Sequence, residues 1–483
     1  MYHISDLKRF VHCPCLHFYS KSDESVFRPY LRSDESISDL IKEYLGIEEC
    51  FEGVRNDASD RFFNDMANHE WFMHTRLADG NMRVNIPVMH KLDNGFEVYF
   101  IHYGTKPKEI DLFGYRVMTE IMDKLSLSVC KAYIIYLDGD YVNEGKLDVH
   151  RLFKTTDTHR DKDILSLIRE KNSDYESIIN KIEATDPSTI TPMKSSYCRL
   201  GGLCSHYHDC FPEEEDEDCD SILTLVSSRN KNTMHEAGIR HLKDADLDLI
   251  EGNRVQYAQV MASRNGGLFV DSLALKEWLD ELSPRPISFI DFEWDRYLVP
   301  TYYGMHPLDV VCFEFALYYI DENGNMEHRT FVGTGDCRRE FVEGLIEYLP
   351  KSGPILAYNA QGAECLRLEE LSEIFPEYRY ELLSIVSRFV DLATPFIEGL
   401  VYDTRMEGNY TLKKLVDICS DYNYKDLDIY DGMEAVYNWR NIGKTSDDLD
   451  KKIVDNLKEY CSLDAYGLFL VYRWLIELIV ESK

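Results

Sequence analysis

The sequence is short of positive charge and of long apolar runs. Its 483 residues include 53 lysines and arginines against 86 aspartates and glutamates, a net charge of −33. Proteins that bind nucleic acid through general electrostatic attraction normally have an excess of basic residues, so the composition by itself argues against such binding. The first twenty residues carry charges and no apolar core, which argues against a secretory signal. The longest apolar stretch, residues 468–480, contains Arg473 and Glu477 and is too short to span a bilayer.

These absences predict a soluble protein of the cytoplasm with no membrane partner. Hydrophobic residues make up 44% of the chain, enough to bury cores, and the length predicts two or three domains. The acidic run EEEDED at residues 213–218 is typical of a solvated connector and predicts a domain boundary. We therefore expect a first domain at residues 1–220, a helical linker at 221–285 and a second domain at 286–483.

The 13 cysteines are an odd number in a chain without an export signal, which argues against a disulfide framework. Three of them, Cys198, Cys204 and Cys210, recur with five residues between each pair. Glycines and a proline keep this stretch out of regular helix, and in a loop several thiolates can turn toward one ion. The spacing predicts a metal or cluster site rather than three unliganded cysteines.

A closed tetrahedral site needs a fourth ligand, and Cys13 is the best candidate. Cys15 is its nearby competitor. His206 and His208 offer a different completion with zinc, because spacing alone does not separate zinc from an iron-sulfur cluster.

The N-terminal residues Ser5, Arg9, Cys13 and Pro14, with a cysteine triplet nearly two hundred residues later, resemble the iron-sulfur nucleases of the RecB and AddB type. The resemblance implies that Cys13 and the triplet hold a [4Fe-4S] cluster. In that family the cluster is structural and joins the two ends of a PD-(D/E)XK fold.

The nuclease centre of that family is an aspartate followed, on the next strand, by an acid-x-lysine motif. The matching strand here is expected at residues 96–103, where Phe100 and His102 occupy the motif positions. The preceding strand offers Asn85 or Pro87 in place of the aspartate. We therefore expect a degenerate nuclease domain whose remaining role is scaffolding or gripping the substrate.

Residues 286–294, PISFIDFEW, predict a buried strand that ends in two acids. Residues two apart in a strand point to the same face, so Asp291 and Glu293 present their carboxylates side by side. Two acids on an otherwise apolar strand are costly unless a cation neutralises them. This pattern predicts a divalent-metal site.

Two later segments carry further polar candidates. One predicted strand ends at Asn359 and runs into a helix with Glu364 near its start. A shorter predicted strand ends with Asp391, where an acid is more often structural than metal-binding.

The last predicted helix, residues 456–480, contains Tyr460 and Asp464 four residues apart and hence on one face. Because Leu457 and Cys461 lie among them on a largely apolar helix, we expect this face to be buried against a partner element.

This order of motifs resembles the tyrosine-bearing branch of the DEDD 3′–5′ exonucleases, which have an RNase H-like fold. The resemblance implies two Mg²⁺ or Mn²⁺ ions held by four carboxylates, with Tyr460 orienting the attacking water. The four are Asp291, Glu293, Glu364 and Asp464. The second-motif acid, Glu364, departs from the pattern: it follows Asn359 by five residues rather than four, and Asp391 is the reserve ligand.

The whole chain resembles a bacterial family of uncharacterised proteins that joins a RecB-like cysteine-cluster domain to such an exonuclease module. The shared segments include DFEW, AYNAQGAECLRL, VDLATPF and YTLKKL. This resemblance implies an α/β fold with a degenerate PD-(D/E)XK-like domain followed by an RNase H-like mixed-sheet domain.

We therefore predict a metal-dependent 3′–5′ exonuclease acting on single-stranded DNA or RNA, with Lys413 and Lys414 as candidate phosphate contacts. One alternative is a catalytically silent nucleic-acid-binding or assembly module of a DNA repair or defence system. Another is a zinc-stabilised protein with no nucleic-acid role. No motif distinguishes DNA from RNA or indicates a protein partner.

Overall fold

The protein is described by a computed structural model, in which it is an α/β protein built from mixed sheets and helices. The described residues are 1–20, 30–193, 198, 204–211, 220–250, 253–282, 285–422, 428–429 and 431–481. They form two compact units. Unit 1 comprises Met1–Pro192 and Arg296–Asp309, and unit 2 comprises Met193–Asp295 and Val310–Lys483.

This division differs from the boundaries expected from the sequence. The acidic run at residues 213–218 lies outside the described residues, and the units separate near residue 192. A short insert, Arg296–Asp309, leaves the C-terminal region and belongs to unit 1. Composition does not reveal such an excursion, because it is defined by contacts between distant parts of the chain.

A six-stranded sheet of order β2-β3-β4-β5-β6-β7 lies at the centre of unit 1. β3, β4 and β5 form an antiparallel meander, whereas β5 and β6 are parallel. Parallel neighbours need a crossover connection, and helix α5 (Leu112–Lys124) provides it. The strands are β2 (Phe51–Glu52), β3 (Trp71–Asp79), β4 (Met82–Leu92), β5 (Gly95–Ile101), β6 (Val129–Leu137) and β7 (Phe153–Thr156).

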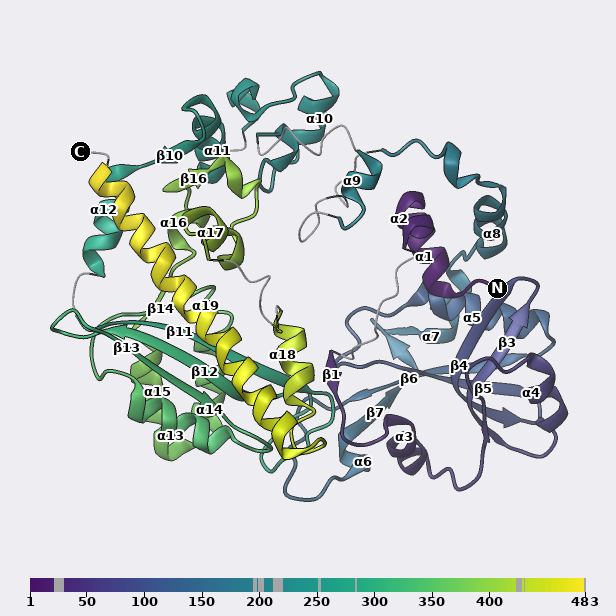
Figure 1. The fold of residues 1–483 in the computed structure, drawn as a ribbon. Helices are drawn as coiled ribbons and strands as arrows, with labels where there is room; N and C mark the ends of the chain where they lie inside the picture. The colour runs from purple at the N-terminus through teal and green to yellow at the C-terminus, as the bar shows by residue number, and fades with distance from the viewer. Residues whose placement is uncertain are drawn as a thin grey trace. The chain divides into compact units, whose positions relative to one another are not determined.

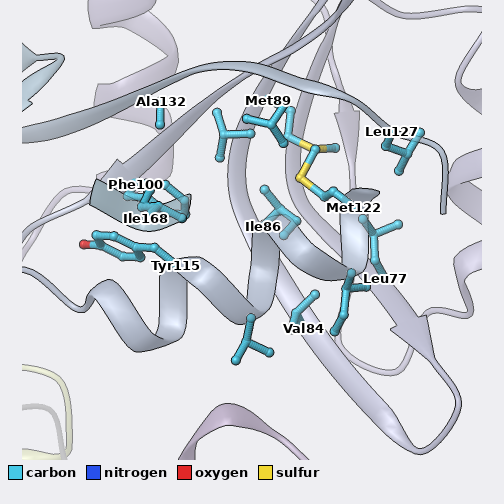
Figure 2. Close-up of a cluster of buried hydrophobic side chains, with 14 of the residues drawn as sticks. Leu77, Val84, Ile86, Met89, Phe100, Tyr115, Met122, Leu127, Ala132 and Ile168 are labelled. Carbon is cyan, nitrogen blue, oxygen red and sulfur yellow. The ribbon is translucent and has the colours of Figure 1, made fainter. Parts of the chain in front are cut away.

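The main hydrophobic core of unit 1 lies between this sheet and α5. Figure 2 shows Ile86 and Phe100 from the strands among side chains that include Tyr115 and Met122 of α5. The rings of Phe100 and Tyr115 stack with their centroids 3.8 Å apart. The other elements of unit 1 are α1 (Ile4–His12), α2 (Pro14–Tyr19), β1 (Leu31–Arg32), α3 (Ile37–Leu45), α4 (Ser59–Asp65), α6 (Val149–Leu152), β8 (Thr158–His159), β9 (Lys162–Asp163), α7 (Ile164–Glu170) and α8 (Tyr175–Ala184).

Unit 2 contains a second mixed sheet, of order β13-β12-β11-β14-β15. β12 and β13 are antiparallel, whereas β14 is parallel to both β11 and β15. The strands are β11 (Ile287–Tyr297), β12 (Val310–Ile320), β13 (Met326–Val332), β14 (Ile355–Ala357) and β15 (Phe389–Asp391). The last two residues of β11 pair with β1 within unit 1.

Helices cover both faces of this sheet (Figure 1). The long helix α19 (Asp447–Glu481) crosses one face, and α13 (Arg338–Tyr348), α14 (Glu364–Ile374) and α15 (Arg379–Val386) cover the other. Along β11 the side chains alternate accordingly. Phe289 packs in the cluster that contains α19, and Ile290 and Phe292 pack in the cluster on the opposite face. The acids at the intervening positions therefore face α19.

α19 is 35 residues long and is held to the sheet by an apolar stripe. Leu457, Cys461, Leu468, Val471 and Leu475 are all fully buried, and they recur at the spacing of one helix face. None of the helices in the described ranges has an apolar stretch of the length that a bilayer span requires.

The segment expected to be a linker is instead part of the core of unit 2. Its helices are α10 (Lys231–Glu236), α11 (Arg254–Arg264) and α12 (Ser272–Glu281). Ala258 and Leu275 are buried in the same cluster as Leu468 of α19. Helices are present in this segment as expected, but residues 238–250, which also have helical spacing, form only the short 3-10 turns Leu242–Asp244 and Leu247–Leu249. Spacing also does not say which surface an apolar stripe will cover. The remaining elements of unit 2 are α9 (Tyr207–Cys210), β10 (Leu268–Val270), α16 (Thr394–Ile397), β16 (Val401–Asp403), α17 (Leu412–Cys419) and α18 (Gly432–Trp439).

Candidate metal centre

Three carboxylates from two elements converge in unit 2. Oxygens of Asp291 and Glu293 of β11 and of Asp464 of α19 all lie within 4.8 Å of one another. Asp464 is only 7% exposed. Within the described ranges, this is the one group of three or more acids, histidines or cysteines arranged closely enough to hold an ion. The two strand acids lie together because they are two residues apart, and α19 adds the third by crossing the same face.

Electrostatics make this cluster unfavourable unless it binds protons or a cation. Burial, together with the charges of the neighbouring acids, raises the pKa of Asp291 well above its ordinary value and that of Glu293 to about 8. At neutral pH the metal-free centre therefore retains protons. Oxygen ligands of this kind suit hard divalent ions such as Mg²⁺, which would replace those protons.

Glu364 borders this centre. It is the first residue of α14, is 2% exposed, and its Oε2 has no hydrogen-bond partner among the described residues. Burial raises its pKa to about 8, and a hydrogen bond from the backbone of Phe292 opposes that rise. Phe292 lies between the two strand acids, and the charge of Glu364 acts on both of them. Glu364 is thus adjacent to the centre but outside the group within 4.8 Å.

Asp391, the reserve ligand, is engaged with the backbone. Its Oδ1 accepts hydrogen bonds of 2.9 Å from the backbone N–H groups of Asn359 and Ala393. Asn359 has a left-handed backbone conformation, with φ of 56°, at the turn after β14. Asn359 and Asp391 therefore stabilise the turn that leads to Glu364.

Tyr460 lies at the centre together with Lys413. The tyrosine is 3% exposed, and the Lys413 ammonium donates a 3.3 Å hydrogen bond to its hydroxyl oxygen. Burial and the charges of Asp464 and Glu293 raise the pKa of Tyr460 far above its ordinary value. The phenol therefore keeps its proton and serves as a hydrogen-bond donor rather than as a base. The second predicted phosphate contact, Lys414, instead forms an ion pair with Glu407 at 3.7 Å.

Three features near the site were not predicted from the sequence. Asp295 of β11 forms a buried ion pair with Arg440, with contacts of 2.6 and 3.0 Å. The thiol of Cys461 lies 3.6 Å from Oδ2 of Asp291. Glu314 of β12 is completely buried. Of these three features, only Glu314 could have been found from the sequence pattern. It is an acid inside an apolar strand, which is the pattern that also indicated Asp291.

The predicted cluster ligands are distributed over both units, with Cys13 in unit 1 and the triplet in unit 2. Within the triplet, the backbone N–H of Cys204 donates a 2.8 Å hydrogen bond to the carbonyl of Cys198, and Cys210 ends the one-turn helix α9. Among the described residues, these thiols do not form a group close enough for a single ion. The triplet is therefore not arranged as a preformed zinc site. A [4Fe-4S] cluster spaces its cysteines farther apart than one ion does, and stays a prediction.

The degenerate nuclease centre expected in unit 1 stays a prediction. Phe100 occupies a motif position and is fully buried in the hydrophobic core, against Tyr115 (Figure 2).

Comparison with known protein families places part of unit 2 beside a described family. Residues 288–411 match a protein family described as a domain of unknown function (DUF2779). The match includes Asp291, Glu293 and Glu364 and ends before Tyr460 and Asp464. No curated protein and no solved structure matches the chain.

Proposed function

We propose that unit 2 is a metal-dependent 3′–5′ exonuclease that hydrolyses the terminal phosphodiester of single-stranded DNA or RNA. The observation that supports this proposal most strongly is the convergence of Asp291, Glu293 and Asp464 within 4.8 Å, with the Tyr460 hydroxyl beside them. The mixed sheet crossed by α19 is compatible with an RNase H-like domain of the DEDD type. In that assignment unit 1 is a degenerate PD-(D/E)XK-like domain.

The donor set fits two Mg²⁺ or Mn²⁺ ions, which Asp291, Glu293 and Asp464 would hold together with Glu364. Such ions supply electrostatic stabilisation of the charge that builds up on phosphate oxygens during hydrolysis. Tyr460 keeps its proton and donates it in a hydrogen bond that orients the attacking water. Lys413, which contacts Tyr460, supplies a positive charge for the phosphate at the scissile bond.

The strongly acidic composition is compatible with this site. A substrate that approaches four carboxylates meets repulsion unless the carboxylates are neutralised, so binding should require divalent ions. This property distinguishes the proposal from non-specific binding by a basic surface, which salt weakens and divalent ions do not restore.

The direct test uses single-stranded DNA and RNA oligonucleotides, each labelled at the 5′ end or at the 3′ end, with Mg²⁺, Mn²⁺ or EDTA. A 3′–5′ exonuclease shortens 5′-labelled substrate progressively and releases the 3′ label at once as a mononucleotide. Asp291→Asn should be inactive. Intact substrate with every ion, or equal activity in the variant, would refute the assignment.

A catalytically silent nucleic-acid-binding or assembly module, acting in DNA repair or defence, is the second candidate. It is favoured by the apolar Phe100 in unit 1 and by a pocket of about 530 Å³ there whose lining includes Lys108, His159 and Arg160. This candidate predicts retained oligonucleotide binding without cleavage under any divalent ion.

We further propose that Cys13, Cys198, Cys204 and Cys210 hold a structural [4Fe-4S] cluster. The regular spacing of Cys198, Cys204 and Cys210, and the resemblance of this pattern with Cys13 to the iron-sulfur nucleases, support this proposal. Anaerobically purified protein should then be brown and contain iron, whereas a colourless protein that contains zinc would contradict this assignment.

A further inference from the structure

Glu314 is a buried acid for which the described structure provides no hydrogen-bond partner. It lies in the middle of β12, has no exposed surface, and both carboxylate oxygens lack a hydrogen-bond partner among the described residues. Buried polar groups in native proteins are nearly always hydrogen-bonded, and an unpartnered carboxylate is among the most costly exceptions. Protonation removes its charge but leaves the new O–H without an acceptor.

The position of Glu314 directs it toward the candidate metal centre. Ala316, two residues later in the same strand, packs against Cys461 and Ala465 of α19. Residues two apart in a strand share a face, so Glu314 also faces α19. Cys461, which is affected by the charge of Glu314, also contacts Asp291.

Four ionisable groups act on Glu314 or are acted on by it. Burial raises the pKa of Glu314 most, the charges of Glu293 and Asp464 raise it further, and Lys458 lowers it. The charge of Glu314 in turn acts on the Cys461 thiol. None of the ion pairs found among the described residues joins Lys458 to Glu314 within 4.0 Å. Two acids of the metal centre therefore act on a third carboxylate, Glu314, which forms no ion pair among the described residues.

We propose that Glu314 is an outer carboxylate of the cation centre, whose negative charge would increase the affinity of the centre for a divalent cation. This proposal rests on the proposed metal-dependent function. Glu314 is not one of the ligands, because it lies outside the group within 4.8 Å. It acts through its charge, which lies near those of Glu293 and Asp464 on the face of the sheet covered by α19.

The test is Mn²⁺ binding to the full-length protein, measured by calorimetry or by the electron paramagnetic resonance of free Mn²⁺. Glu314→Gln keeps the shape of the side chain and removes its charge. The Kd for Mn²⁺ should increase roughly ten- to a hundredfold, the usual range when a residue just outside the metal ligands is replaced. In EDTA the variant should melt no lower than the wild type, because the neutral amide replaces a buried acid that is itself costly without a cation.

The matched control is Glu327→Gln on the neighbouring strand β13. Glu327 pairs with Tyr319 of β12. Tyr319 is five residues from Glu314, which is roughly 17 Å at the usual rise of a strand, so Glu327 is also distant from Glu314. It is partly exposed and pairs with Arg329 at 3.3 Å. Its replacement should leave Mn²⁺ binding unchanged.

Asp291→Asn separates failure of this proposal from failure of the metal centre itself. If Asp291→Asn abolishes Mn²⁺ binding and Glu314→Gln binds like the wild type, Glu314 is only a buried acid and the proposal is overturned. If neither variant changes Mn²⁺ binding, the metal centre and the function proposed from it both fail.

Glu314→Asp provides a second variant in case the glutamine variant does not fold. It retains the charge, so it should bind Mn²⁺ more tightly than Glu314→Gln and Glu314→Ala do. Circular dichroism checks that the variants being compared have equal helical content. Equal loss of affinity in a folded Glu314→Asp and a folded Glu314→Ala would show that the charge has no role, and would overturn the proposal.

Discussion

Asp291→Asn should stabilise the metal-free protein while removing its response to divalent ions. Asp291 has two carboxylate neighbours within 4.8 Å, Glu293 and Asp464. Two full charges at that distance repel by about 3.5 kcal/mol at an effective dielectric constant of 20. Protons held on the centre at neutral pH already relieve most of this repulsion, so we expect a net gain of about 1–2 kcal/mol from the substitution.

The melting temperature in EDTA converts this gain into an observable. For a unit of this size, 1 kcal/mol corresponds to about 2–4 °C, so Asp291→Asn should melt about 2–8 °C above the wild type. Wild-type protein with Mn²⁺ at a hundred times its Kd should gain about 2.7 kcal/mol, and the variant should gain little. Differential scanning fluorimetry of the full-length protein measures both effects.

The control is Asp280→Asn on α12, which removes a solvent-exposed aspartate paired with Lys276. It should leave both the melting temperature and the response to Mn²⁺ close to those of the wild type. If Asp291→Asn melts below the wild type in EDTA, the reasoning is refuted, because the carboxylates then do not repel one another. An undiminished response to Mn²⁺ would refute it as well, because Asp291 would then not hold the ion.

Three further predictions follow from the same contacts. Folding raises the pKa of Glu293 and of Glu364 from 4.5 to about 8. As the pH rises, the unfolded chain loses these protons before the folded protein does, so metal-free stability should fall between pH 4.5 and about 8 and level off above. Mg²⁺ should remove this fall in thermal melts. Tyr460→Phe should lower the exonuclease rate roughly ten- to a hundredfold with unchanged Mn²⁺ affinity; an unchanged rate excludes its water-orienting role. Asp295→Ala leaves Arg440 buried without its carboxylate and should cost about 3–5 kcal/mol in urea unfolding, whereas a loss near zero would show that the pair is not structural.

Much of the candidate site could be predicted from local pattern. The alternation in PISFIDFEW correctly placed Asp291 and Glu293 on one face of a buried strand, because strand geometry repeats every two residues. The four-residue spacing of Tyr460 and Asp464 correctly placed them on one helix face. Glu364 begins a helix, where a negative charge is favoured by the exposed backbone N–H groups.

Features that depend on long-range contacts could not be predicted in this way. The Asp295–Arg440 ion pair joins residues 145 positions apart, and nothing in either local segment specifies the other. The helices at residues 254–281 have the pattern of any amphipathic segment, so their place in the core of unit 2 was missed. Lys413 was predicted as a phosphate contact, but its hydrogen bond to Tyr460 depends on how α17 packs beside α19.

The sequence by itself determined which residues are acidic, which face of each element they occupy, and that an apolar strand carries two carboxylates at a cost only protons or a cation can relieve. Tertiary structure decided that α19 crosses the face of β11 that bears these acids, so that Asp464 completes the group of three and Tyr460 keeps its proton. It also decided that Glu314 faces the same centre. The physical reason is that periodicity sets the direction of a side chain within its own element, whereas packing between elements sets what that side chain meets.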